Sequence, residues 1–219
     1  MFHFLTRTNE RSSAAVFGIA LYEVTTRIAF ILALAAPLAG VSAAQTAKPT
    51  KNYTPADVHF LAGMIGHHAQ AIQMAGWAPS HGANPSVRVL CERIVVAQND
   101  EIVFAQRWLR EHGEYVPPAD PRGHIMQGMD HPMLMPGMLT PEQMAQLDSA
   151  RGPEFDRLFL TFMIQHHQGA ITMVQQLLAV PGAAQDGPIF RFASDVNVDQ
   201  TTEINRMTLM LNDLKRSSQ

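Results

Sequence analysis

The fold of this chain is decided by a segment that occurs twice. Residues 57–74 read DVHFLAGMIGHHAQAIQM, and residues 156–173 read DRLFLTFMIQHHQGAITM. At an offset of 99 residues, ten of these eighteen positions are identical. Self-similarity of this kind indicates two copies of one structural unit.

Helix signals surround both copies. Proline is favoured at the first position of a helix, where its missing N–H costs nothing. Four such pairs mark the expected starts: Thr54-Pro55, Asn84-Pro85, Thr140-Pro141 and Gly187-Pro188. No segment shows sustained period-two alternation, so we expect no sheet. Each unit is therefore predicted to be a helical hairpin.

Apolar residues follow coiled-coil spacing along each expected helix, which predicts an all-α, up-down-up-down four-helix bundle. Each stripe is broken near its middle by polar residues. These are His67, Gln98 with Glu101, His166, and Gln200 with Glu203. Burying such groups is costly unless each finds a partner or an ion.

We expect one domain over residues 54–216, preceded by a linker at 44–53. The first hairpin covers 54–113, a Met-, His- and Pro-rich connecting loop covers 114–140, and the second hairpin covers 141–216. A loop this long in a compact domain is usually functional or disordered.

The amino-terminal residues 1–43 have the features of a secretory signal: a charged flank, an apolar run and a small-residue cleavage site after Ala43. The alternative is an uncleaved membrane anchor over 28–44. That run is short against the roughly 20 residues of a membrane span, and Pro37 interrupts it. We therefore expect a periplasmic or secreted protein, with no stable membrane association once the signal is removed.

Composition excludes several classes of protein. The 219 residues carry 19 acidic and 16 basic side chains, a net charge of −3, and nucleic-acid binders usually show a basic field instead. The single cysteine, Cys91, rules out an all-thiolate metal site and is expected to be a small buried hydrophobe. No nucleophile–base pair, phosphate loop or nucleotide fingerprint is present, so we do not expect an enzyme.

Thirteen Met and ten His are the unusual part of this composition. Met64 lies three residues before His67 and four before His68, so the three share a helix face. Thioether sulfur suits Cu(I), and imidazole suits copper in both oxidation states. The candidate metal ligands are His67, His68, His166, His167, Met64, Met74, Met163, Met173, Glu101 and Glu203.

Alternatives exist for each ligand type. The two Glu can orient a ligating His through its second ring nitrogen, or bind Cu(II) or zinc directly. The His–Glu pairs can also be purely structural, and the helical Met can be core filler.

The connecting loop offers a second group of candidates. Five Met fall within thirteen residues there, and Pro and Gly interrupt them, which makes a core role hard to explain. A flexible Met/His tract suits capture of soft ions, although a disordered linker is an equal alternative. The possible loop ligands are His124, Met126, Met129, His131, Met133, Met135 and Met138.

Several motifs make the sequence similar to a known family. M-I-x-H-H-x-x-A-I-x-M at 64–74 and 163–173, M-P-G-M-L-T-P-E-Q-M at 135–144 and Q-x-x-E-I at 98–102 and 200–204 resemble the domain-of-unknown-function 305 family. The resemblance implies a ferritin-like four-helix bundle that is usually exported. It also implies copper binding, because some members are described as copper-binding proteins linked to copper tolerance. One departure is Ala105, which stands where the second half has Met207.

The leading hypothesis is an exported protein that buffers, sequesters or relays Cu(I)/Cu(II), with a metal ion as its partner. A ferritin-like di-metal (iron) oxidase or storage protein is the first alternative. It normally needs Glu-x-x-His on two helices, and this chain has no such motif. The second alternative is a non-metal helical scaffold with a structural polar core.

Overall fold

The computed structural model describes residues 51–124 and 133–217, and its regular secondary structure there is entirely helical. An isolated β-bridge pairs His124 with Met133, and no strand forms in the described ranges. The helices are α1 (Pro55–Gly76), α2 (Pro85–Glu111), α3 (Pro141–Ser149), α4 (Pro153–Leu178) and α5 (Gly187–Ser217). The predicted all-α class is confirmed. The expected signal segment and the candidates Met126, Met129 and His131 lie outside the described residues.

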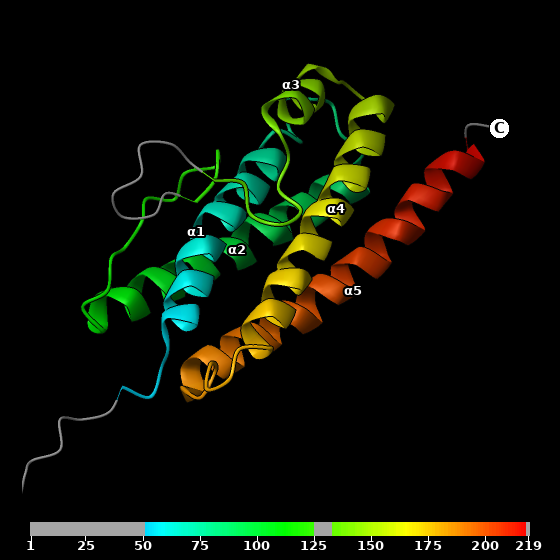
Figure 1. Cartoon of the computed structure of the whole chain (residues 1–219). Coiled ribbons are helices and arrows are strands. Elements are labelled where there is room, and N and C mark those ends of the chain that lie inside the picture. Colours follow the sequence, from blue (N-terminus) through cyan, green and yellow to red (C-terminus); the bar gives the residue numbers. More distant parts are fainter. Residues whose placement is uncertain (1–50, 125–132, 218–219) are drawn as a thin grey trace, which may run out of the picture. The chain divides into compact units, whose positions relative to one another are not determined.

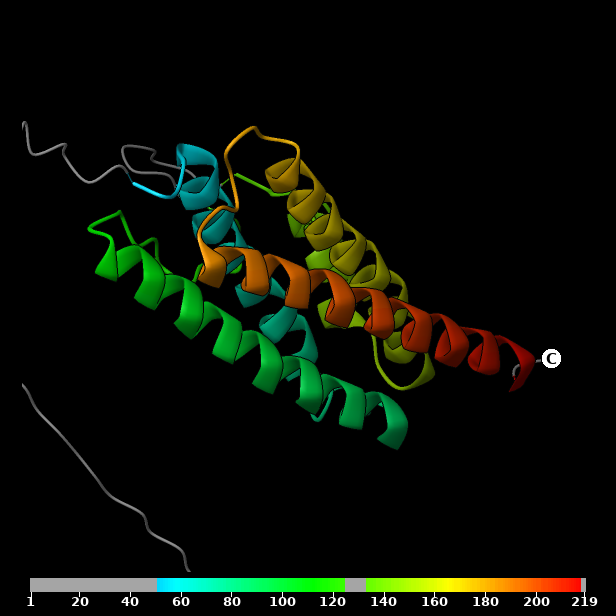
Figure 2. The same cartoon turned by 90° about the horizontal axis from the view of Figure 1, so that it is seen from below.

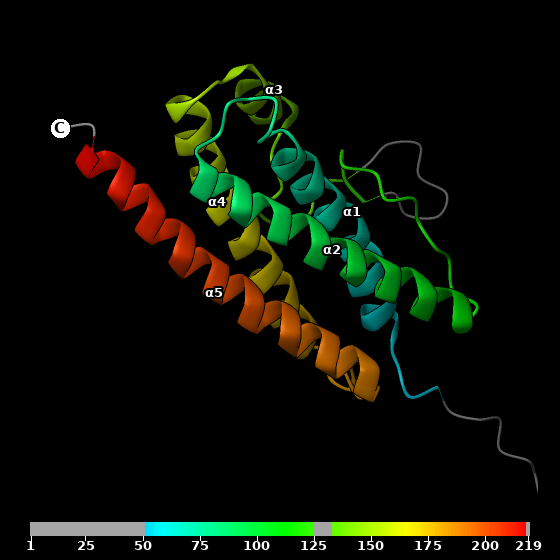
Figure 3. The same ribbon diagram turned by 180° about the vertical axis from the view of Figure 1, so that it is seen from behind.

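The four long helices form two hairpins. Helix α1 packs along α2 and α4 packs along α5, while α1 and α4 join the hairpins to each other. Figure 1 shows α1 and α4 with α3 at one end, and Figures 2 and 3 show α2 and α5 on the reverse side. Along their described length, α2 and α5 make no comparable contact with each other, and a groove runs between them. Closure into an up-down-up-down bundle therefore stays a prediction.

The repeated aspartate of each copy ties the two hairpins together. Asp57 accepts a hydrogen bond from the backbone N–H of Thr54 (2.7 Å), which satisfies a free donor at the start of α1. It also accepts one from the N–H of Ala184 (2.7 Å) in the turn of the other hairpin. Asp156 of the second hairpin makes the matching contact with the turn of the first hairpin, because it accepts a hydrogen bond from the backbone N–H of Asn84 (3.1 Å), just before α2. Each copy thus holds the turn of its partner.

The second hairpin contains one helix more than the repeat predicts. Thr140 and Gln143 form a capping box that starts α3, in agreement with the Thr-Pro signal. The chain then breaks at Gly152, whose φ of +57° lies in the left-handed region that glycine adopts without strain. Helix α4 begins after it, at Pro153.

Apolar side chains form two separate clusters. The first core cluster gathers around Phe60, Met64, Trp108, Met173 and Phe192. The second core cluster gathers around Met74, Ile94, Phe155, Phe159 and Met163, and includes Cys91. Burial raises the pKa of the Cys91 thiol to about 12, so this side chain behaves as the small buried hydrophobe predicted for it.

In the described part of the chain, no helix has the length and apolar character that crossing a membrane requires. The segment 28–44, considered above as a possible anchor, lies outside that part.

Candidate metal centre

A layer of polar side chains separates the two core clusters. On α1, for example, Met64 belongs to the first cluster and Met74 to the second, and the paired histidines lie between them. We call this set the histidine layer: His67, His68, Gln98, Glu101, His166, His167, Gln200 and Glu203. The four histidines have no exposed surface. A polar break was expected near the middle of each stripe, and the structure brings these breaks together.

His67 and His166 form the contact between the two copies of the motif. Their ring centroids lie 3.8 Å apart, with an angle of 41° between the ring planes. Burial, reinforced by the neighbouring His68, lowers the pKa of His67 to about 3, and burial holds the pKa of His166 well below its usual value. Both rings are therefore uncharged at neutral pH, which is the form of imidazole that binds metals.

The partners of the ring nitrogens assign where the protons lie. His67 Nε2 is 3.0 Å from the carbonyl oxygen of Pro136, and His167 Nε2 is 2.6 Å from a carboxylate oxygen of Glu203. A carbonyl or carboxylate oxygen only accepts, so Nε2 of both rings donates. Because the His67 ring is uncharged, its lone pair is then on Nδ1.

The Nδ1 atoms of all four histidines are buried without a hydrogen-bond partner. His68 Nε2 lies 2.8 Å from Glu101 Oε2, in the same arrangement as His167 and Glu203, but its angle is outside hydrogen-bond geometry. Neither ring nitrogen of His166 has a partner. An unpaired buried polar atom costs about 1–3 kcal/mol, so these lone pairs are a feature to be explained.

The layer is not a preformed cage. Within residues 51–124 and 133–217, no three His, Cys, Asp or Glu side chains converge on a point where they could hold an ion. The arrangement is a central His67–His166 pair flanked by two His–Glu pairs. Buried imidazoles with unpartnered ring nitrogens, two of them with a carboxylate at the second nitrogen, fit a soft or borderline ion of low coordination number.

The motif methionines lie on both sides of the layer. Met64 and Met173 belong to the first core cluster, and Met74 and Met163 belong to the second. All four are buried. They therefore pack the core here, which is the alternative role considered for them from the sequence.

The described part of the connecting loop forms no helix or strand, but some of its side chains are packed into the core. Met135 and Met138 belong to the first core cluster, and the backbone N–H of Met135 donates to the sulfur of Met138 (3.3 Å). Their interruption by Pro and Gly did not suggest this core role. Met133 is half-buried, and His124 is buried against His59 with an unpartnered Nδ1.

Gln70 holds this loop against α1, a role that the sequence did not reveal. Its side-chain amide donates to the carbonyls of Leu139 and Pro121 (both 3.1 Å) and accepts from the N–H of Leu139 (2.7 Å). A difference between the two copies could have indicated this role, because Gln70 occupies the position that Gly169 has in the second copy. A Cβ at Gly169 would lie 1.9 Å from the Pro136 oxygen, so only glycine leaves room for the loop on α4.

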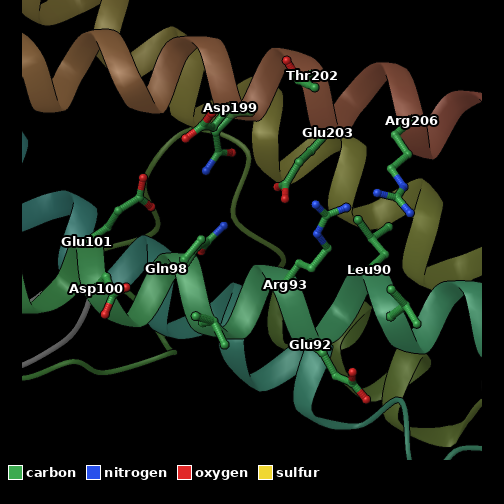
Figure 4. Close-up of a pocket in the computed structure, with 14 residues that line it drawn as sticks. Leu90, Glu92, Arg93, Gln98, Asp100, Glu101, Asp199, Thr202, Glu203 and Arg206 are labelled. Carbon is green, nitrogen blue, oxygen red and sulfur yellow. The ribbon is translucent and has the colours of Figure 1, made fainter.

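The groove between α2 and α5 reaches the layer from the other side. It has a volume of about 820 Å³, and Figure 4 shows Gln98, Glu101, Asp199 and Glu203 directed into it. The side chains of Glu101 and Glu203 are 18% and 23% exposed, whereas the histidines behind them are fully covered. Burial and the nearby carboxylates Glu101, Asp195 and Glu203 raise the pKa of Asp199.

The fold and the layer together define a class: an all-helical protein of two repeated hairpins with a buried histidine layer between them. The family model described as Domain of unknown function (DUF305) matches residues 57–211. The chain therefore belongs to the DUF305 family.

Solved structures agree with this assignment. A DUF305 protein from Streptomyces coelicolor, described as a "putative secreted protein", is 25% identical over 75% of this chain and 95% of its own, with a TM-score of 0.63. A DUF305 fragment from Deinococcus radiodurans is 29% identical over 74% of this chain and 98% of its own, with a TM-score of 0.60. CopM in its Cu(II)-bound form is 26% identical over 72% of this chain and 96% of its own, with a TM-score of 0.54. No curated protein matches.

Proposed function

We propose that this protein is an exported, non-catalytic copper-binding protein that buffers, sequesters or relays Cu(I)/Cu(II) through the histidine layer, in the service of copper tolerance. One observation carries the proposal: four fully buried histidines, each with an unpartnered Nδ1, meet between the two hairpins. A bound ion would use the lone pairs that the folded protein leaves unpaired.

The chemistry of the layer favours copper. In this proposal Glu101 and Glu203 act on the second ring nitrogen of His68 and His167 and orient these rings toward the ion. Imidazole binds copper in both oxidation states, and Cu(I) accepts low coordination numbers, which suits a layer built around one histidine pair. The methionines above and below can contribute a thioether if their side chains rotate.

The relatives support both parts of the proposal. CopM has solved structures in a Cu(II)-bound and a Cu(I)-bound form, at 26% and 25% identity to this chain. The description of the Streptomyces coelicolor protein as secreted supports export, in line with the signal predicted over residues 1–43.

The two alternatives fit the layer less well. A di-metal oxidase needs a carboxylate-rich core, and only Glu101 and Glu203 reach this layer, each against a histidine. A purely structural polar core should satisfy its own hydrogen bonds, whereas the Nδ1 atoms here are left without partners.

The test uses protein expressed with its own leader and purified from the exported fraction. Competition with a Cu(I) chelator and elemental analysis should give about one or two equivalents of copper per chain. A variant with all four layer histidines changed to glutamine should lose this binding: His67, His68, His166 and His167. Circular dichroism shows whether that variant folds.

A matched control is His112→Gln, since this histidine stacks on Trp108 outside the layer and should leave copper binding unchanged. If the four-histidine variant is destabilised, the pair variant His67→Gln/His166→Gln tests the central contact alone. Wild-type copper binding by either folded variant would reject the histidine layer as the site.

A further inference from the structure

One side of the histidine layer is closed by the connecting loop. The Pro136 carbonyl accepts from His67 Nε2, and Gly169 leaves no space between α4 and this carbonyl. On α1, a Cβ at Gly66 would lie 2.7 Å from the backbone oxygen of Gly123, so the loop also packs against this helix, though less closely than against α4. Figure 1 shows the loop that leads into α3 lying over α1 and α4. Where it is described, the loop therefore covers His67, Gly66 and Gly169 on this side of the layer.

The opposite side is open through the groove between α2 and α5 (Figure 4). Glu101 and Glu203 connect the groove to the layer, because each lines the groove and also contacts a buried histidine ring at 2.8 Å or 2.6 Å. Among the described residues, the groove is therefore the route on which polar side chains lead continuously from solvent to the layer.

The side chains that line the groove carry a net negative charge, which favours the entry of a cation. Five carboxylates line it against two arginines, Arg93 and Arg206, so its net charge is negative. Asp100 and Asp199 are exposed at its outer edge. A narrow cleft lined by one sign of charge concentrates the opposite ion and speeds its arrival.

Two buried amides line the same groove. Gln98 and Gln200 are 2% and 3% exposed, and each has a side-chain oxygen without a hydrogen-bond partner. Amide oxygens with free lone pairs can replace water around a cation. This second observation is independent of the carboxylates and also points to a cation.

We propose that the groove between α2 and α5 is the entrance through which a hydrated copper ion reaches the histidine layer. This inference rests on the copper-binding function proposed above. Asp100 and Asp199 attract the ion, and Gln98 and Gln200 replace part of its water. Glu101 and Glu203 then direct it into the layer, where the Nδ1 atoms can bind it. The groove governs how fast copper enters and leaves, and the layer governs how tightly it is held.

The first test blocks the groove. Ala97 is exposed and lines it one helical turn before Glu101, so Ala97→Trp fills the space without touching the layer. Stopped-flow quenching of tryptophan fluorescence by Cu(II) measures entry, and removal by a chelator measures exit. We expect both rates to fall several-fold while the dissociation constant stays unchanged. Ala145→Trp, on an exposed face of α3, is the matched control and should leave both rates unchanged.

The second test removes charge. Asp100→Asn/Asp199→Asn should lower the association rate about tenfold at low ionic strength. The difference should shrink as salt is added, because salt screens exposed charges. Glu111→Gln/Glu142→Gln removes the same charge outside the groove and should load copper at the wild-type rate.

The outcomes separate this inference from the proposed function. Wild-type rates in both groove variants, with normal copper binding, would overturn the entrance and leave the copper site standing. A lower copper stoichiometry at unchanged rates would also overturn it, because the groove would then be a binding site instead. If the wild-type protein bound no copper, both proposals would fall together.

Discussion

A single methyl group at Gly169 tests how the loop is held over the histidine layer. In α4 a Cβ at this position would lie 1.9 Å from the Pro136 oxygen and 2.6 Å from the Gly137 Cα. Ordinary contacts of a Cβ begin near 3.4 Å, so the loop must move outward by about 1.5 Å in Gly169→Ala. The clash is with backbone on both sides, and no side-chain rotation relieves it.

The expected loss of stability follows from what moves with the loop. The hydrogen bond between His67 and Pro136 contributes about 1 kcal/mol. Met135, Met138 and Leu139 are at most 9% exposed, and full burial of such a side chain stabilises by about 1.5–3 kcal/mol, of which a partial shift loses a fraction. The higher helix propensity of alanine compared with glycine offsets about 1 kcal/mol of this loss. We expect Gly169→Ala to lower the free energy of unfolding by about 2–4 kcal/mol.

Urea unfolding followed by circular dichroism measures this change, and Gly76→Ala is the matched control. Gly76 is the last residue of α1, and a Cβ there would meet nothing within 4 Å. The control should be neutral or more stable by up to about 1 kcal/mol. If Gly169→Ala proved as stable as Gly76→Ala, the loop would not be seated on α4 as described.

Three further predictions concern the layer and the loop. The folded-state pKa of His67, about 3, is below its unfolded value, so its contribution to stability is complete above pH 6.5. That contribution is lost as the pH falls toward 3, at about 1.4 kcal/mol per pH unit, and His166 adds a loss of the same sign. If the urea concentration at the unfolding midpoint did not decrease from pH 6.5 to pH 4.5, this prediction would be contradicted. Gln70→Met removes three hydrogen bonds to the loop and should cost about 2–4 kcal/mol in urea unfolding, against almost nothing for the exposed Gln73→Met. Glu203→Gln should weaken copper binding about 10–100-fold in chelator competition, and unchanged affinity would show that this carboxylate does not orient His167 for a bound ion.

The helices were predictable because their signals are local. An X-Pro pair with a polar group three residues on fixes a helix start within one turn, as at Thr54 and Thr140. Coiled-coil spacing likewise placed His67 and Gln98 on the apolar stripes of their own helices, because residues on one helix face are fixed by their separation in the chain. The candidate site was accessible from the sequence for the same reason.

Other features depend on contacts between distant residues. The core position of Met135 is reached against α1, more than seventy residues earlier, where its methyl carbon would lie 2.7 Å from a Cβ at Gly63. The groove depends on the angle between α2 and α5, which stripes on single helices do not specify.

The sequence by itself determined two copies of one helical hairpin, each with the same pair of histidines at the same level. Only the tertiary structure decided that the two histidine pairs have different surroundings. One loop cannot lie in the same way on both, so His67 donates to Pro136 while neither nitrogen of His166 has a partner. The described part of the loop covers one side of the layer, and a groove between α2 and α5 leads to the other side. Tertiary packing therefore also decides from which side the histidines can be reached.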